Sequence, residues 1–335
     1  MTLAGEGEPA TEPTPAEEAA LPLPPELGPA PGPILATDPL DVAGRKAMWT
    51  HVDRLLRHEA AMRDPERADE LRRFRVATRR LRAAIRLFRP AFKDSEVDPI
   101  ADALGTVADA VGAVRDIDVH VAALLAWATE RGPDSVLRIQ PLVDAWQAER
   151  RAGMAVLEGR LASRRHARLL TRLVDFVRLP DRGGDDQGSG PVVRDRAGSQ
   201  VWRAFEQVRE FTPIVRWADP PTLHRLRIQA KRLRYSLEFL GDVLGPDRPW
   251  LVERLVALQD HLGALNDAVV TSAAVRAFLA HAQARLSPAE RAEVVAYLEA
   301  REREARSLRR AASRPWRAVA GITFARRLAR TAIVR

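Results

Sequence analysis

The chain has 335 residues and no cysteine, which excludes disulfides, thiolate metal sites and cysteine nucleophiles. No stretch reaches the roughly 18 to 20 continuous apolar residues of a membrane span, and no basic segment precedes an apolar one at the N-terminus, so we expect a cytoplasmic protein. The net charge is +8, but residues 1–40 carry seven acidic and no basic residues, which leaves +15 on residues 41–335. Fifty of the 53 basic residues are arginine, which favours a polyanionic partner because guanidinium groups bind oxygen atoms bidentately.

The chain divides into segments of different composition. Residues 1–40 hold ten of the 24 prolines, so we predict a disordered acidic tail. From residue 41 onward, apolar residues recur three and four positions apart, which predicts an all-α body. The Gly- and Asp-rich segment 181–191 predicts a linker between a first helical half at 41–180 and a second at 192–313, with a basic C-terminal extension at 314–335.

Two pairs of segments repeat at a separation of about 150 residues, which is a sign of duplication. The segment LRRFRVATRRLRAAIRLF at 71–88 aligns with LHRLRIQAKRLRYSLEFL at 223–240. Downstream, LGTVADAVGAVRDID at 104–118 aligns with LVALQDHLGALNDAV at 255–269. The repeats predict that the two halves of the chain are duplicated helical units with long basic helices.

The helical phase of the first repeat pair gathers basic residues on one face. At about 100° per residue, the basic side chains of each segment share one arc, and the apolar side chains lie opposite. Like charges at these spacings repel one another, and neither stripe contains an acid except for Glu238. We therefore interpret the stripes as anion-binding surfaces. The candidate contacts are Arg72, Arg75, Arg79, Arg82 and Arg86, then His224, Arg227, Lys231 and Arg234, and in the preceding helix at 41–63 Arg54, Arg57 and His58; Arg80 and Arg232 lie off the arcs.

These residues resemble the signatures of the CHAD family, the conserved histidine α-helical domain. The second half carries HRLRIQAKRLRYSLE at 224–238 and LQDHLGALNDA at 258–268, and the first half carries FRVATRRLRAAIRLF at 74–88 and VGAVRDIDV at 111–119. The resemblance covers roughly residues 41–313. It implies an all-α fold of two pseudo-symmetric helical bundles, each a four-helix-type unit, with basic surfaces that bind inorganic polyphosphate. It also implies association with polyphosphate granules and, in many members, an adjoining CYTH triphosphatase domain. In the first half, Arg72 occupies the position equivalent to His224, so the family's histidine is missing there. Arginine carries a permanent positive charge at that position.

Asp116 and Asp267 occupy equivalent positions in the second repeat pair. We interpret them as supporting residues that orient arginines of the basic stripes. An alternative is a Mg²⁺-dependent phosphohydrolase that uses both carboxylates. A second alternative is RNA binding, which the basic body would also allow. No nucleotide-binding loop, nucleophile elbow or metal-binding histidine spacing is present, so we predict a binding protein with no catalytic residues, no metal and no cofactor.

Overall fold

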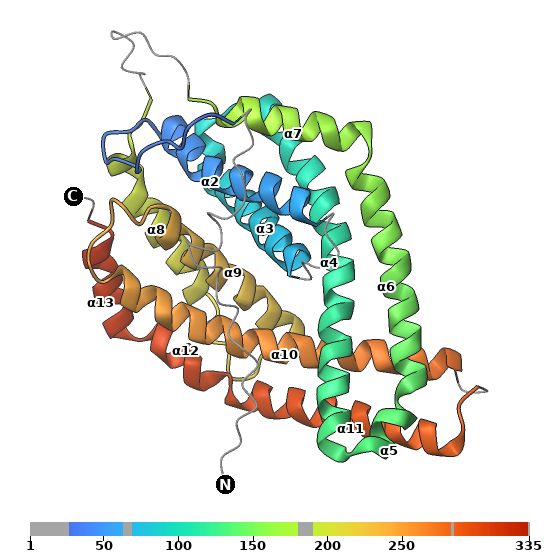
Figure 1. The fold of residues 1–335 in the computed structure, drawn as a ribbon. Helices are drawn as coiled ribbons and strands as arrows, with labels where there is room; N and C mark the ends of the chain where they lie inside the picture. The colour runs from blue at the N-terminus through green and yellow to red at the C-terminus, as the bar shows by residue number, and fades with distance from the viewer. Residues whose placement is uncertain (1–26, 63–68, 180–189, 283–284, 334–335) are drawn as a thin grey trace.

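The computed structural model describes residues 27–62, 69–179, 190–282 and 285–333, and every regular element within them is helical (Figure 1). The all-α class predicted from the sequence is thereby confirmed. In chain order the elements are α2 (Leu40–Ala61), α3 (Glu70–Phe88), η1 (Arg89–Ala91), α4 (Asp94–Arg131), α5 (Pro133–Arg138), α6 (Gln140–Leu161), α7 (Arg164–Val177), α8 (Val193–Arg209), α9 (Pro220–Phe239), α10 (Arg248–Ala282), α11 (Pro288–Ala311), α12 (Ser313–Ala320) and α13 (Ile322–Thr331).

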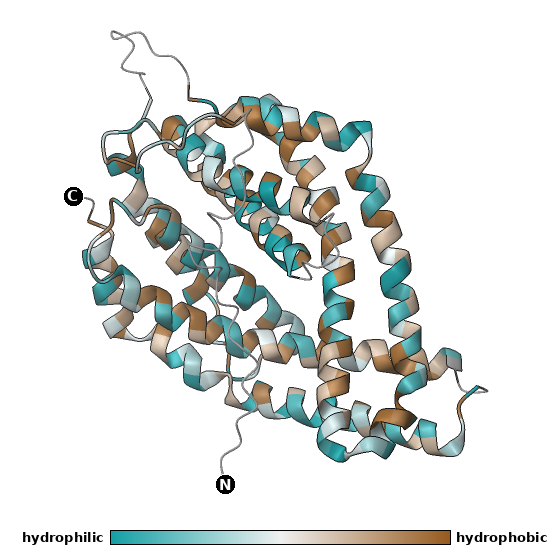
Figure 2. Ribbon diagram, in the orientation of Figure 1, coloured by the Kyte–Doolittle hydropathy of each residue, from teal (hydrophilic) through white to brown (hydrophobic). Residues whose placement is uncertain are grey.

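The larger hydrophobic cluster joins helices from both predicted halves of the chain. Phe74 and Phe88 on α3, Phe205 on α8, Leu233 on α9 and Leu255 on α10 are fully buried in it. Figure 2 shows the matching pattern, in which brown apolar turns alternate with teal polar ones along most helices. On α3 and α9, burial of the apolar face therefore determines the direction in which the basic stripe of the same helix points.

A second hydrophobic cluster lies where α4 and α10 extend beyond the first one. These helices are 38 and 35 residues long, and their far halves pack with α5, α6 and α11 around Trp146 and Tyr297 (Figure 1). Glu293 on α11 accepts hydrogen bonds from Ser135 at 2.6 Å and from Arg131 at 2.9 Å. Both clusters thus combine helices of the two sequence halves, and the pseudo-symmetry of the halves stays a prediction.

Among the described residues, α10 is the one helix long and apolar enough to span a membrane by length and composition. Its leucines Leu251, Leu255, Leu258 and Leu262 are buried in the larger cluster. Packing inside the protein therefore accounts for part of the apolar composition of this helix.

Residues 27–40 lie before the predicted boundary at residue 41, yet they pack against the helices. Leu27 and Ile34 are buried, and the Ile34 amide donates a hydrogen bond to Asp242 Oδ2 at 3.1 Å. A backbone bridge joins Pro39 to Val192. The prediction of disorder was therefore wrong for residues 27–40, because two apolar anchors hold this proline-rich segment against the helices. Residues 1–26 and most of the predicted linker, residues 180–189, lie outside the described residues.

The C-terminal segment is part of the helical body, not an extension from it. Trp316 and Val319 on α12 and Phe324 and Leu328 on α13 are buried. Phe324 stacks on Phe205 of α8, with ring centroids 5.5 Å apart. The described part of the predicted basic extension at 314–335 therefore forms helices whose apolar residues complete the core, while its arginines remain at the surface.

Candidate anion-binding site

The two repeat helices, α3 and α9, contact each other and bury the faces that the helical phase predicted. On α3, Phe74, Leu81 and Phe88 are buried, and on α9, Leu226 and Leu233 are buried. The opposite faces carry the basic stripes. Packing of both apolar faces on one core leaves the two stripes on the same side of the molecule, where their charges meet.

The charges of the two stripes act on one another across the α3–α9 contact. Burial, followed by repulsion from Arg227, Arg79 and Arg75, lowers the pKa of Lys231 to about 7. Burial likewise lowers the pKa of Arg227, and Arg79 and Arg75 lower it further. Because Arg75 and Arg79 are on α3 whereas Arg227 and Lys231 are on α9, the duplicated stripes form one cationic cluster.

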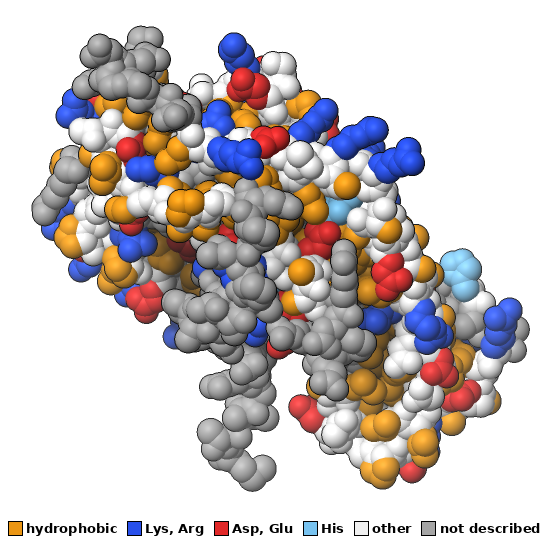
Figure 3. All heavy atoms as spheres, turned by 45° about the horizontal axis from the view of Figure 1, so that its top comes forward, with side chains coloured by type: hydrophobic (Ala, Val, Ile, Leu, Met, Phe, Trp, Pro, Cys, Tyr) orange, Lys and Arg blue, Asp and Glu red, His pale blue; other side chains and the backbone are white. Residues whose placement is uncertain are grey.

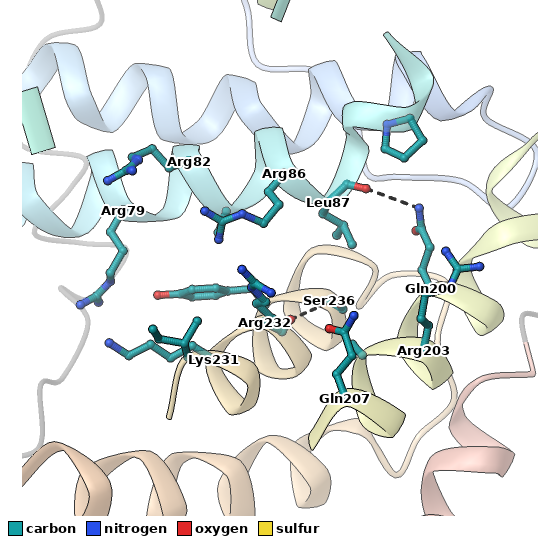
Figure 4. Close-up of a pocket in the computed structure, with 15 residues that line it drawn as sticks. Arg79, Arg82, Arg86, Leu87, Gln200, Arg203, Gln207, Lys231, Arg232 and Ser236 are labelled. Atoms are coloured by element: carbon teal, nitrogen blue, oxygen red, sulfur yellow. Dashed lines mark hydrogen bonds between the residues drawn. The ribbon is translucent and has the colours of Figure 1, made fainter. Parts of the chain in front are cut away.

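A cavity of about 430 Å³ opens beside this cluster, between α3, α8 and α9. Figure 4 shows Arg79 and Arg86 of α3 extending toward Lys231 and Arg232 of α9. Six basic side chains and no acidic one line the cavity, whose residues are Arg79, Arg82, Ala83, Arg86, Leu87, Pro90, Gln200, Arg203, Ala204, Gln207, Ile228, Lys231, Arg232, Tyr235 and Ser236. Such a lining is suited to an anion and excludes a cationic ligand.

The matched carboxylates lie beside the arginines, as predicted for supporting residues. Asp116 Oδ1 accepts a hydrogen bond from Arg75 Nη2 at 3.2 Å. The charge of Asp267 raises the pKa of Arg227 and of Arg75, against the larger effect of burial. Each carboxylate therefore stabilises the charged form of a guanidinium group near the cluster.

Gly263, in the second repeat pair, makes room for one of these arginines. A Cβ atom at this position would lie 3.2 Å from Arg227 Nη2 and 3.4 Å from its Nε. At Gly112, the equivalent position in the first half, a Cβ atom would meet nothing within 4 Å. The glycine of the second half therefore lets the Arg227 guanidinium lie against α10.

Glu238, the acid at the end of the second stripe, joins the two repeat helices. It forms ion pairs with Arg80 of α3 at 3.0 Å and with Arg234 of α9 at 3.3 Å. Arg80 is 8% exposed. The charge of Arg234 is therefore largely compensated within the protein, which makes Arg234 a weaker candidate for an anion contact than Lys231.

A family model described as the CHAD domain matches residues 46–276, which is more than half of the chain. The chain belongs to the CHAD domain family. Among solved structures, the protein is similar to "PptA from Streptomyces chartreusis", with a TM-score of 0.64 and 15% identity over 84% of this chain and 100% of that one. It is also similar to the CHAD domain from the plant Ricinus communis, with a TM-score of 0.60 and 22% identity over 92% and 98% of the two chains. These likenesses show the fold, and a comparison with curated proteins found no match.

The histidine of the CHAD signature lies on the surface rather than in the cavity. His224 is exposed, and its Nδ1 atom is 2.7 Å from Asn266 Oδ1, a residue of the second repeat pair on α10. The hydrogen bond ties the start of α9 to α10. Arg72, which occupies the equivalent position on α3, is half-buried and is also absent from the cavity lining.

The sequence predicted that Arg54, Arg57 and His58 of α2 contact the anion, and this prediction is wrong for His58. This side chain is 3% exposed, and its Nδ1 atom lies 2.7 Å from Glu70 Oε2. Arg57 pairs with Asp53 on its own helix at 2.8 Å. Arg54 lines a different cavity together with Arg80 and Glu238. Acidic neighbours on α2 and α3 therefore occupy two of these three residues, so the cationic cluster gains nothing from them.

The sequence analysis did not identify the residues that α8 contributes to the cavity beside the cationic cluster. Gln200, Arg203 and Gln207 line the cavity opposite the repeat helices (Figure 4). Their spacing of three and four residues places them on one helical face, which is the signal that would have found them. They were overlooked because α8 lies outside the repeated segments.

Proposed function

We propose that this CHAD protein binds inorganic polyphosphate along the cationic surface that α3 and α9 share. The observation that carries the proposal is the cavity lining, in which six basic side chains stand without an acidic one. Bringing these charges together is unfavourable in the free protein. Burial lowers the pKa of Lys231 most, and repulsion from the neighbouring arginines lowers it further, which reflects part of that cost. A bound polyanion removes the repulsion, so the cluster is better suited to the bound state.

Hydrogen-bond donors in the cluster also favour a ligand rich in acceptor oxygens. Within the described residues, the buried Nε–H groups of Arg79, Arg227 and Arg232 have no hydrogen-bond partner. A buried donor without a partner costs about 1 to 3 kcal/mol, and more when the group is charged. Phosphate oxygens accept from guanidinium groups in the bidentate geometry that arginine prefers. Polyphosphate supplies such oxygens at every unit along its length.

The test is a titration of long-chain polyphosphate into the protein and into charge-reversal variants. Arg79→Glu/Arg82→Glu changes the α3 stripe, and Arg227→Glu/Lys231→Glu changes the α9 stripe. The matched control is Arg168→Glu/Arg172→Glu, because both side chains are exposed on α7, where Figure 3 shows basic side chains along one edge of the surface. We expect at least a tenfold weaker Kd in both stripe variants and little change in the control. An equal loss in all three would mean that the protein is a general polyanion binder.

We further propose that binding occurs without hydrolysis of the polymer. Asp116 is engaged by Arg75, which favours an orienting role for this carboxylate over a metal-binding one. Incubation with polyphosphate and Mg²⁺ or Mn²⁺ should leave the chain length unchanged on a gel. Shortening that disappears in Asp267→Asn would contradict this proposal and support the phosphohydrolase alternative.

RNA is a weaker candidate ligand. Single-stranded nucleic acid is bound by aromatic side chains on which successive bases stack. Tyr235, the aromatic residue of the cavity lining, is 6% exposed and offers little ring surface. We therefore expect single-stranded RNA of equal charge to displace polyphosphate poorly, whereas equal competition would support RNA binding.

We also propose that polyphosphate binding recruits the protein to polyphosphate granules in the cytoplasm. In cells that accumulate the polymer, a fluorescent fusion of the full chain should form foci on the granules. The Arg227→Glu/Lys231→Glu fusion should remain diffuse. Foci that persist in this variant would show that another surface directs the localisation.

A further inference from the structure

The cavity beside the cationic cluster has two chemically different ends. Arg79, Arg82 and Lys231 stand at one end, and Gln200, Arg203 and Gln207 of α8 stand at the other (Figure 4). A uniform phosphate chain would be matched by basic residues throughout. Two neutral amide side chains beside a single arginine at the α8 end indicate a ligand whose two ends differ in chemistry.

Apolar side chains line much of the cavity. Five of its lining residues, Ala83, Leu87, Pro90, Ala204 and Ile228, present hydrocarbon surface. Leu87 lies at the end where Gln200 stands (Figure 4). A bare phosphate chain has no apolar surface to place against them. The cavity volume of about 430 Å³ is in the range of pockets that hold small organic ligands, which combine apolar walls with a few placed polar groups. The apolar surface at the α8 end, which includes Leu87 and Ala204, therefore fits an organic group attached to the phosphates.

The polar groups at this end are those that recognise a nucleobase. The Gln200 Nε2 amide donates to the Leu87 carbonyl oxygen at 3.4 Å, and its buried Oε1 atom has no hydrogen-bond partner among the described residues. Glutamine amides pair with the donor and acceptor edge of adenine. The guanidinium groups of Arg86, Arg203 and Arg232 also line the cavity, and such planar groups stack on aromatic rings. Base stacking, edge recognition and phosphate binding are thus available within one cavity.

We propose that this cavity binds a purine nucleoside polyphosphate. The phosphates lie against Arg79, Arg82 and Lys231, and the base lies toward Gln200 and Gln207. This inference rests on the proposed function, because the cations that bind the nucleotide phosphates are those that bind polyphosphate. The nucleotide and the polymer therefore compete for the same cations.

The experiment compares ATP with inorganic tripolyphosphate by calorimetric titration of the full chain in buffer without magnesium. Tripolyphosphate has the same number of phosphates and at least the same negative charge, so charge alone predicts that ATP binds no tighter. Contacts to the base predict that ATP binds about fivefold tighter or more. Equal affinities, or weaker binding of ATP, overturn this inference and leave the proposed function standing. Failure of both tripolyphosphate and long-chain polyphosphate to bind overturns the proposed function itself.

Two variants locate the base. Ala204→Leu fills the cavity at its α8 end, and Gln200→Ala removes the Oε1 acceptor that has no partner among the described residues. Both should lower the ratio of ATP affinity to tripolyphosphate affinity to about one, relative to Ser199→Leu, a control on the exposed face of α8 outside the cavity lining. Far-ultraviolet circular dichroism checks that each variant is folded. A ratio that stays high in both folded variants places the base elsewhere and overturns the inference.

Discussion

Arg80 of α3 and Glu238 of α9 form an ion pair at 3.0 Å, and this pair joins the two helices that carry the basic stripes. Arg80 is 8% exposed, and the Glu238 side chain is 18% exposed. Glu238 also pairs with Arg234. One carboxylate thus holds two arginines in place beside the cationic cluster, and the repeat helices are positioned by an ionic contact as well as by their apolar faces.

Glu238→Gln should destabilise the protein substantially. The substitution leaves the buried Arg80 charge without its carboxylate, a loss that costs about 3 to 5 kcal/mol for a buried pair. Urea unfolding followed by circular dichroism measures the change. The control is Glu302→Gln, which removes surface pairs with Arg276 and Arg306 and should cost about 1 kcal/mol or less. Equal losses in the two variants would show that the Arg80–Glu238 pair is not an important link between the helices.

Polyphosphate binding should depend on pH through Lys231. The pKa of this lysine is lowered to about 7 in the free protein, and nearby phosphate charge favours the ammonium form and so raises its pKa on binding. The complex therefore takes up a proton above pH 7, and affinity falls as pH rises from about 7 toward the ordinary lysine range. The slope reaches at most about one log unit of Kd per pH unit. Lys231→Arg should remove this dependence, whereas an identical pH profile in the variant would exclude Lys231 as its source.

Lys231 should also make the free protein less stable at neutral pH than at alkaline pH. Its folded-state pKa lies below its unfolded value of 10.5, so the unfolded chain binds more protons between the two values. This lysine therefore lowers stability most below about pH 7, and the penalty diminishes as pH rises from 7 toward 10.5. Lys231→Met should stabilise the free protein at pH 7 by about 1 to 2 kcal/mol while it weakens polyphosphate binding. A destabilised variant in urea unfolding would contradict this account of the charge cluster.

Gly263→Ala should weaken binding with little effect on folding. The added Cβ atom lies 3.2 Å from Arg227 Nη2, so the guanidinium group must move away from α10. We expect a loss of about threefold to tenfold in polyphosphate affinity, the effect of one impaired charged contact.

Gly112→Ala is the matched control, because nothing lies within 4 Å of its Cβ atom. In a helix interior the control should raise stability by about 0.5 to 1 kcal/mol and leave Kd unchanged. Identical titrations of the two variants would remove Arg227 from the site.

The sequence predicted the two stripes correctly because helical phase depends only on local spacing. Phe74, Leu81, Leu226 and Leu233 are all buried. The stripe residues between them, which are Arg75, Arg79, Arg227 and Lys231, are half-buried on the opposite faces, whereas Arg80, off the arc, is buried. The repeats predicted that Asp116 pairs with an arginine of the stripes but did not specify which one, and the structure pairs it with Arg75. The helical spacing of apolar residues was therefore enough to predict the fold class, and the repeated segments were enough to predict the two basic stripes of the candidate site.

The remaining features depended on contacts that spacing does not reveal. His58 was predicted to contact the anion, but it is paired with Glu70 at the start of the next helix, α3. The cavity wall formed by Gln200 and Gln207 depends on how α8 packs beside α9. Ile34 is anchored by Asp242, which is 208 positions away in the chain. Each of these features arises from tertiary packing, so no local pattern could have specified it.

The measurement that tests the central claim most directly is the salt dependence of polyphosphate affinity in single charge-removal variants. Each phosphate contact releases counterions, so log Kd plotted against log salt concentration should have a steep slope in the unmodified protein. Arg79→Gln on α3 and Arg227→Gln on α9 should each reduce that slope by about 0.7 to 0.9, by analogy with nucleic acids, while Arg168→Gln on α7 should leave it unchanged. Equal slopes in all four proteins would show that α3 and α9 do not bind the polymer together.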